Sequence, residues 1–182
     1  MISASACASL DRMFVHSLQN TFFTPEGERA AVTQVAQSLP DAGAQMVVLM
    51  IASHTFRLVM ALHFPQAGEA LRLLVPDSDG GDAGPHAFRD QMSERGNMCC
   101  GMVNREMGRF FAHTGMSTPQ IIDSRSGPFM TALPHAYATH WRVAVDARLH
   151  IDASLCMHNR APMDFEWHAH AQQEVTGELE FF

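Results

Sequence analysis

Residues 85–111 read PHAFRDQMSERGNMCCGMVNREMGRFF and predict one long helix that begins at the proline. Apolar or small residues recur on one side of this helix at intervals of three and four. This is the pattern of an amphipathic helix that packs on a core. The expected core side consists of Phe88, Met92, Gly96, Cys99, Val103, Met107 and Phe110.

The opposite side of the predicted helix is polar and consists of Asp90, Glu94, Asn97, Gly101, Asn104 and Arg105. A helix face that only meets solvent usually carries long side chains of opposite charge four residues apart. Here the carboxylate of Glu94 and the carboxamide of Asn97 lie one turn apart, and Gly101 follows after another turn. A surface this small, polar and flat suits contact with another protein.

Glu94 and Asn97 are therefore candidates for a catalytic pair. A carboxylate accepts a hydrogen bond from an ammonium group, and a carboxamide both donates to and accepts from water. Together they could position a water for in-line attack on a phosphoryl group, a reaction in which positioning supplies most of the catalysis. The spacing E-x-x-N is by itself a weak pattern, and a solvated helix face without a task is the alternative.

Four spaced positions resemble the signature of the CheC/CheX/FliY chemotaxis phosphatases. That signature is Asp or Ser, three residues, Glu, two residues, Asn, and then 21 residues to a Pro, and Asp90, Glu94, Asn97 and Pro119 stand at these positions. The runs N-M-x-x-G and T-P-x-x-I, which begin at Asn97 and Thr118, are also similar. CheC-type members carry two such signatures. The single copy here resembles the CheX type.

The resemblance implies a phosphatase that hydrolyses the phospho-aspartate of a CheY-like response-regulator receiver domain in two-component signalling. Glu94 would form a salt bridge with the receiver's active-site lysine, and Asn97 would orient the attacking water. The receiver would supply the Mg²⁺, so no cofactor of the chain's own is expected. A module that binds a receiver without hydrolysing its phospho-aspartate is the alternative.

The remaining positions of the polar side have weaker implied roles. Asp90 and Pro119 would be structural or peripheral to the chemistry, and Gly101 would let the receiver backbone come close. For Asn104 and Arg105, docking to the receiver stands against plain solvation of the helix. Members of the CheX type can pair through sheet edges, so a homodimer is expected by resemblance.

Outside the long helix, the sequence predicts an α+β fold, an antiparallel sheet with long helices packed on one face, as in CheC and CheX. A CheX-like domain is expected over 1–157, followed by a polar extension over 158–182 with one candidate strand at 165–170. Further helices are predicted at 3–20, from Thr24 to before Pro40, and at 65–74. Strands are predicted at 46–53, 56–64, 119–123, around 141–145, and at 149–157, with a loop at 124–134.

Composition excludes several classes of protein. The net charge of −7 leaves no basic face for phosphates, so we expect no nucleic-acid partner. The chain has no lysine, which excludes a catalytic Schiff base. No apolar run approaches the roughly 20 residues of a membrane-spanning helix, and the N-terminus lacks the basic region of a signal peptide. A cytoplasmic protein without a membrane segment is expected.

We expect no metal site, although two segments invite one. The acidic, glycine-rich residues 77–84 lack the residue order of an EF-hand. His168 and His170 would point the same way in a strand, and a metal-binding or structural role of these tail histidines is a third hypothesis. The four cysteines fit no common zinc spacing and are expected to be reduced, with Cys99 in the core and Cys100 flanking it.

Overall fold

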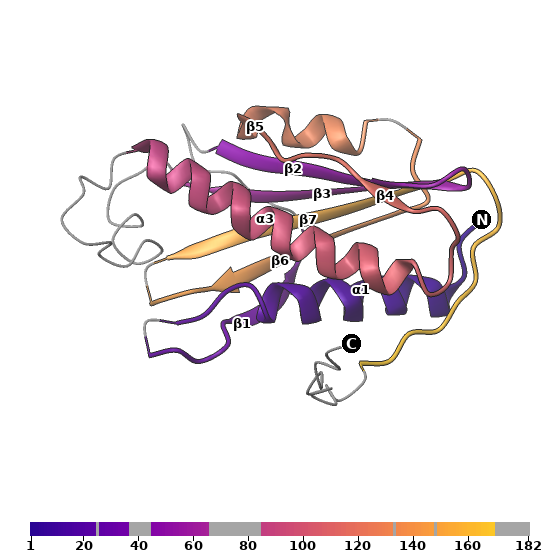
Figure 1. Cartoon of the computed structure of the whole chain (residues 1–182), viewed down its shortest axis with the longest axis horizontal. Coiled ribbons are helices and arrows are strands. Elements are labelled where there is room, and N and C mark those ends of the chain that lie inside the picture. The colour runs from indigo at the N-terminus through magenta and orange to yellow at the C-terminus, as the bar shows by residue number, and fades with distance from the viewer. Residues whose placement is uncertain (25, 37–44, 66–84, 133, 148, 170–182) are drawn as a thin grey trace, which may run out of the picture.

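A single antiparallel sheet forms the centre of the computed structural model, which describes residues 1–24, 26–36, 45–65, 85–132, 134–147 and 149–169. Within these residues the sheet has seven strands in the order β1-β6-β7-β3-β2-β4, and β5 also pairs with β2 (Figure 1). The strands are β1 Ala31–Val35, β2 Gln45–Ala52, β3 Phe56–Phe64, β4 Gly115–Met116, β5 Gln120–Asp123, β6 Tyr137–Ala144 and β7 His150–Asn159.

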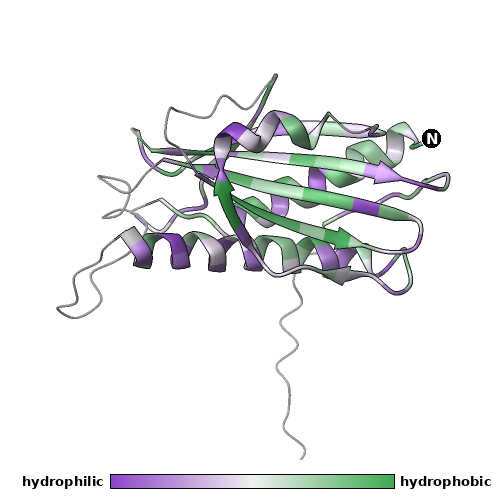
Figure 2. Ribbon diagram, turned by 90° about the horizontal axis from the view of Figure 1, so that it is seen from above, coloured by the Kyte–Doolittle hydropathy of each residue, from purple (hydrophilic) through white to green (hydrophobic). Residues whose placement is uncertain are grey.

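Two long helices, α1 (Ala4–Gln19) and α3 (Pro85–Met107), pack against each other and against this sheet. They lie on the same face of it (Figure 1). The central strands are largely apolar along their length, whereas polar and apolar residues alternate around the helices (Figure 2). This confirms the predicted α+β class with long helices on one face of an antiparallel sheet.

Helix α1 begins where the sequence predicts it. Ser3 is the N-cap, and its hydroxyl accepts a hydrogen bond from the backbone N–H of Ala6 at 3.0 Å. Leu10, Phe14 and Leu18 are buried, as their spacing of four residues requires. The strands predicted at 46–53 and 56–64 are also confirmed, and they pair as an antiparallel hairpin in which Ser53 donates its backbone N–H to the carbonyl of Phe56.

The helix predicted from Thr24 to before Pro40 is wrong, because β1 is a strand paired with β6. Thr24 does not cap a helix. Its carbonyl accepts from the N–H of Gly27 at 2.9 Å, which closes a turn, and Gly27 has φ +83°. That left-handed conformation breaks a helix, and the β-branched residues Val32, Thr33 and Val35 then favour the strand.

Two further differences concern ends and connections. Helix α3 ends at Met107, not at residue 111, so Phe110 is 39% exposed instead of lying in the core. The predicted loop at 124–134 contains the 3₁₀ helix η1, Ser124–Met130, with Asp123 as its N-cap. The predicted helix at 65–74, apart from its first residue, and the acidic segment at 77–84 lie outside the described residues.

The C-terminal segment does not form the strand predicted at 165–170, as far as its described residues 165–169 show. It packs along α1, because α1 presents polar side chains that satisfy its backbone. The N–H of Trp167 donates to Ser9 Oγ at 2.9 Å, and Arg12 donates to the Trp167 carbonyl. Phe165 and Trp167 are buried in the same core as the sheet.

Candidate functional site on the long helix

The face of α3 that carries Glu94 and Asn97 is fixed by close contact on the opposite side of the helix. Gly96 is buried against β2, where an added Cβ would lie 2.8 Å from Val47 Cγ1 and 3.0 Å from Leu49 Cδ1. Only a residue without a side chain permits this approach. The narrow contact holds the middle of α3 on the sheet and directs the neighbouring polar residues away from it.

Contacts with α1 and the turn after it hold the flank of the same helical turn. Arg95 Nη1 donates to the carbonyl of Thr21 at 2.8 Å, and its guanidinium lies 5.5 Å from the ring centre of Phe22. One turn further on, Cys99 Sγ lies 3.1 Å from the hydroxyl of Ser17. These anchors fix the rotation of α3, and with it the direction in which Glu94 and Asn97 point.

Both adjacent cysteines belong to the core, which corrects the flanking position predicted for Cys100. Cys99 and Cys100 are fully buried and free. Burial raises the pKa of each thiol to about 12. Because the thiolate is the reactive form, both thiols are poor nucleophiles at neutral pH.

Asp90, Glu94 and Asn97 are exposed along one line of α3, as the helical period predicts. The carboxyl of Glu94 and the carboxamide of Asn97 are one turn apart, about 5–6 Å between Cβ atoms in a helix. Within the part of the chain that the structure describes, neither side chain has a hydrogen bond or an ion pair. Both are therefore available to groups of another molecule.

The sequence analysis did not single out Met98, which is 49% exposed beside Asn97. The same helical period that identified the polar side places Met98 at its margin, so its position was predictable. An exposed methionine next to polar groups adds an apolar contact to the face. We refer to Asp90, Glu94, Asn97, Met98 and Gly101 as the α3 face.

The C-terminal end of the predicted polar side is less open than expected. Asn104 is half-buried, and its Oδ1 is buried without a hydrogen-bond partner among the described residues. Arg105 is exposed, and its Nε lies 3.6 Å from Glu106 Oε1. Arg105 is therefore open to solvent or to a partner, whereas Asn104 is not simply solvated.

Pro119, which is distant in sequence, belongs to a segment that returns beside α3. Strands β4 and β5 flank Pro119, and both contact α3. Ser117 ties this segment to β2 by accepting from the backbone N–H of Met50 at 3.0 Å. Gly101 faces Met116, whose sulfur would lie 4.0 Å from an added Cβ. The fold thus brings Pro119 to the side of the helix that carries the rest of the signature.

The described residues contain no group of three or more His, Cys, Asp or Glu side chains that could hold a metal ion. His168 lies 3.2 Å from Glu166, and His170 is outside the described residues.

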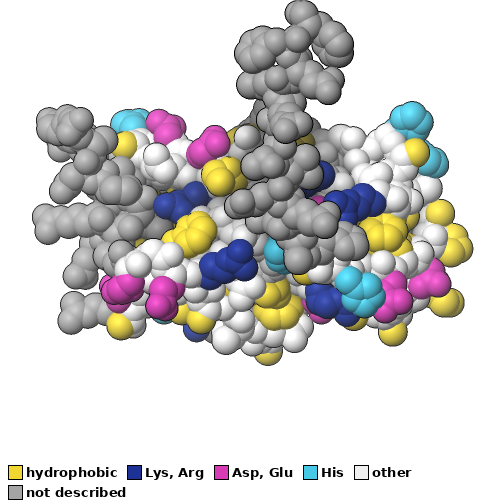
Figure 3. Space-filling view, turned by 60° about the horizontal axis from the view of Figure 1, so that its bottom comes forward, with side chains coloured by type: hydrophobic (Ala, Val, Ile, Leu, Met, Phe, Trp, Pro, Cys, Tyr) yellow, Lys and Arg dark blue, Asp and Glu magenta, His cyan; other side chains and the backbone are white. Residues whose placement is uncertain are grey.

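Among the residues that the structure describes, no helix has the length and apolar character needed to span a membrane. Arginine side chains lie interspersed with acidic and apolar ones on the face shown in Figure 3.

No protein-family model matches the chain, and no curated protein matches it significantly. Solved structures of chemotaxis proteins do match. One is a putative chemotaxis protein from Desulfovibrio vulgaris Hildenborough, with a TM-score of 0.61, 14% identity, and coverage of 86% of this chain and 100% of that one. Another is the chemotaxis protein CheX from Vibrio vulnificus, with a TM-score of 0.58, 16% identity, and coverage of 82% and 99%.

A third match is the CheX chain in the CheX–CheY–BeF₃–Mg²⁺ complex from Borrelia burgdorferi, with a TM-score of 0.58 and 10% identity. It covers 84% of this chain and 97% of that one. Identities this low establish the architecture and not the chemistry. The chain therefore has the fold of the CheC-like and CheX chemotaxis proteins, which confirms the resemblance predicted from residues 90–119 at the level of the fold.

Proposed function

We propose that the chain is a phosphatase for the phospho-aspartate of a CheY-like receiver domain. The observation that carries the proposal is the α3 face, with Glu94 and Asn97 exposed one turn apart on a helix seated rigidly against the sheet. A protein of the same fold, CheX from Borrelia burgdorferi, forms a complex with CheY, BeF₃ and Mg²⁺. That complex supports a receiver domain as the partner.

In this mechanism the two side chains have separate tasks. The Glu94 carboxylate accepts from the ammonium group of the receiver's active-site lysine and sets the position of the two proteins. The Asn97 carboxamide, which can both donate a hydrogen bond to water and accept one from it, holds the attacking water with its oxygen in line with the acyl-phosphate bond. The receiver holds the Mg²⁺ that neutralises charge on the phosphoryl oxygens.

The geometry of the face fits these tasks. Gly101 adds no side chain to the face, so the receiver backbone can approach there. Asp90 lies one turn before Glu94, on the margin where a partner would make peripheral contacts. Arg105 extends the same line and is exposed, so it is a candidate for docking. Asn104 is half-buried and is a weaker candidate.

The test is phosphate release from receiver domains loaded with acetyl phosphate. Asn97→Ala should return the release rate to that of the receiver alone, and Asn97→Asp, which keeps the size but loses the donor, should do the same. Glu94→Gln should weaken association with the receiver. Glu28→Gln, an exposed glutamate in the turn before β1, is the matched control and should leave both quantities unchanged.

The alternative of a non-catalytic receiver-binding module predicts a different result. The wild-type chain would bind the phosphorylated receiver without shortening its lifetime, and Asn97→Ala would change nothing. If the chain neither bound nor accelerated any receiver of the same organism, the proposal would be wrong.

We further propose that the homodimer expected by resemblance forms through a sheet edge. Among the described residues β1 pairs only with β6, so its outer edge presents backbone groups that a second strand can pair with. Light scattering after size-exclusion chromatography gives the mass. A monomer at all concentrations would exclude the dimer.

A further inference from the structure

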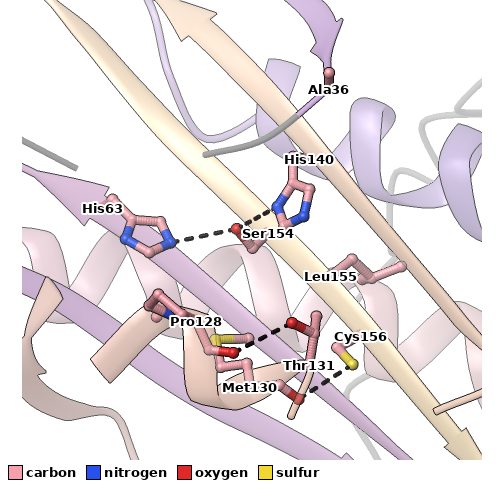
Figure 4. Close-up of a pocket in the computed structure, with 10 residues that line it drawn as sticks. Ala36, His63, Pro128, Met130, Thr131, His140, Ser154, Leu155 and Cys156 are labelled. Carbon is pink, nitrogen blue, oxygen red and sulfur yellow. Dashed lines mark hydrogen bonds between the residues drawn. The ribbon is translucent and has the colours of Figure 1, made fainter. Parts of the chain in front are cut away.

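A concave site separate from the α3 face lies on the face of the sheet opposite α1 and α3 (Figure 4). Residues that pair directly across antiparallel strands point to the same side of the sheet. Met46, His63 and Asp152 are such partners on β2, β3 and β7, and they alternate with Val47, which faces α3. Between this side of the sheet and η1 is a cavity of about 300 Å³.

The floor of this cavity is a row of three polar side chains from three adjacent strands. Ser154 of β7 lies between His140 of β6 and His63 of β3 (Figure 4). Its Oγ is 2.9 Å from His140 Nδ1 and 3.3 Å from His63 Nε2. A neutral imidazole has one donor and one acceptor, so the hydroxyl can donate to one ring and accept from the other.

This arrangement leaves one nitrogen without a partner. His63 and Ser154 are each only 5% exposed, and His63 Nδ1 is buried with no hydrogen bond among the described residues. Whichever tautomer His63 adopts, this atom is an unused donor or an unused acceptor. Buried polar atoms are nearly always paired in folded proteins, and an unpaired one costs stability. His63 Nδ1 lies beside Gly127 of η1, where an added Cβ would be 3.9 Å from it, so the row leaves one polar atom unused on the η1 side of the cavity.

The cavity has no net charge to offer a ligand. The Asp152 carboxylate beside the row is held by Arg142, with Nε at 2.8 Å and Nη2 at 3.1 Å. Burial lowers the pKa of His63 to about 4 and also lowers that of His140, so both rings are neutral at pH 7. A charged ligand would lose its hydration here without gaining a counter-charge.

The wall opposite the floor differs in character. It comes from η1 and the residues after it, and it presents Pro128 and Met130. The hydroxyl of Thr131 already donates a hydrogen bond to the carbonyl of Pro128 at 3.2 Å. The cavity thus combines a polar floor, which offers both donors and acceptors, with an apolar wall. Concave sites with a few convergent polar groups on an apolar lining are typical of small-molecule binding.

We infer that the cavity under η1 binds a small uncharged molecule with a polar edge and an apolar face, of the class of single-ring aromatic or heterocyclic amides. An amide edge carries a donor and an acceptor side by side, which matches the His63–Ser154–His140 row. A ring packs against Pro128 and Met130. The site lies across the sheet from the α3 face, so it is independent of the proposed phosphatase activity.

The test uses three probes of the same shape and different charge on the full chain at pH 7: benzamide, benzoate and benzamidinium. Nuclear magnetic resonance of the histidine ring nitrogens reports binding directly. We expect benzamide to shift the His63 and His140 signals saturably, with the millimolar affinity of a fragment. The two charged probes should bind at least tenfold more weakly.

Variants locate the site. His140→Gln should weaken benzamide binding at least tenfold. His54→Gln changes an exposed histidine in the turn between β2 and β3, and it should leave the affinity unchanged. The comparison of the three probes on the wild-type chain does not depend on how the variants fold. Absence of any shift, equal or tighter binding of a charged probe, or equal effects of the two variants would overturn the inference.

Discussion

Gly96→Ala is expected to destabilise the protein, although alanine is the better helix former. An alanine Cβ at this position would lie 2.8 Å from Val47 Cγ1 and 3.0 Å from Leu49 Cδ1. Both neighbours are buried side chains of β2, and valine is too short and too stiff to swing aside. Either α3 must move away from the sheet or β2 must repack.

The expected change in the free energy of unfolding combines two opposing effects. Inserting a methyl group into a packed interior destabilises by about 1–3 kcal/mol. Replacing glycine by alanine inside a helix stabilises by about 0.5–1 kcal/mol. The difference is a net loss of about 0.5–2 kcal/mol, measured by urea unfolding followed by circular dichroism.

The matched control is Gly101→Ala, the same substitution five residues later on α3. Its added Cβ meets only the Met116 sulfur at 4.0 Å, which is ordinary contact. The helix-propensity gain of about 0.5–1 kcal/mol should therefore remain, so the two variants should change stability in opposite directions. Under the proposed function, Gly101→Ala should nevertheless weaken association with a receiver domain.

A Gly96→Ala variant that is as stable as the wild type, or more stable, would refute the reasoning. It would mean that the side chains of β2 repack around the added methyl group without loss of stability. The close approach of Gly96 to β2 would then not fix the rotation of the α3 face. Equal stabilisation by both substitutions would lead to the same conclusion.

Three other predictions concern the core and the opposite side of the sheet. Folded His63 stays neutral down to a pKa of about 4, whereas the unfolded imidazole takes up its proton near 6.5. The unfolded state therefore binds more protons between these values, and up to about 3 kcal/mol of stability is lost as the pH falls from 6.5 through 4. Urea unfolding at several pH values should show a flatter profile for His63→Asn, and an unchanged profile would contradict the assignment. Trp167→Ala should destabilise by about 3–5 kcal/mol, since the ring is a fully packed part of the core. Glu166→Ala next to it should stay within about 0.5 kcal/mol, and similar values for both variants in thermal unfolding would show that the C-terminal segment is not part of the core. Arg142→Met leaves the buried carboxylate of Asp152 unpaired and should destabilise by about 3–5 kcal/mol. Combining it with Asp152→Leu should restore most of that loss in the same assay, and a purely additive double variant would contradict a specific pair.

The long, regular elements were predictable from the sequence. Helix α3 and strands β2, β3 and β7 have apolar periods that persist over eight or more residues, so the pattern outweighs local exceptions. The short segment after Thr24 was not predictable in this way. Its Thr-Pro-Glu run is a typical helix start, and only the turn at Gly27 and the pairing of β1 with β6 make it a strand.

The same distinction holds for the candidate site. The helical period placed Asp90, Glu94 and Asn97 together on an exposed line, and the structure has them there. The period could not predict that Asn104 is half-buried, because its burial depends on chain outside the helix. The deep burial of Cys100 has the same reason, because it also depends on elements outside α3.

The sequence alone determined the amphipathic helix, its polar face and the class of fold. Each of these follows from the spacing of apolar residues within single helices and strands, which can be seen in the sequence. The row of His63, Ser154 and His140 has no such period. Its members are 91 and 14 residues apart, and only the register of β3, β6 and β7 brings them together. A sequence pattern reports which side of an element is buried, whereas tertiary structure decides which distant side chains meet there.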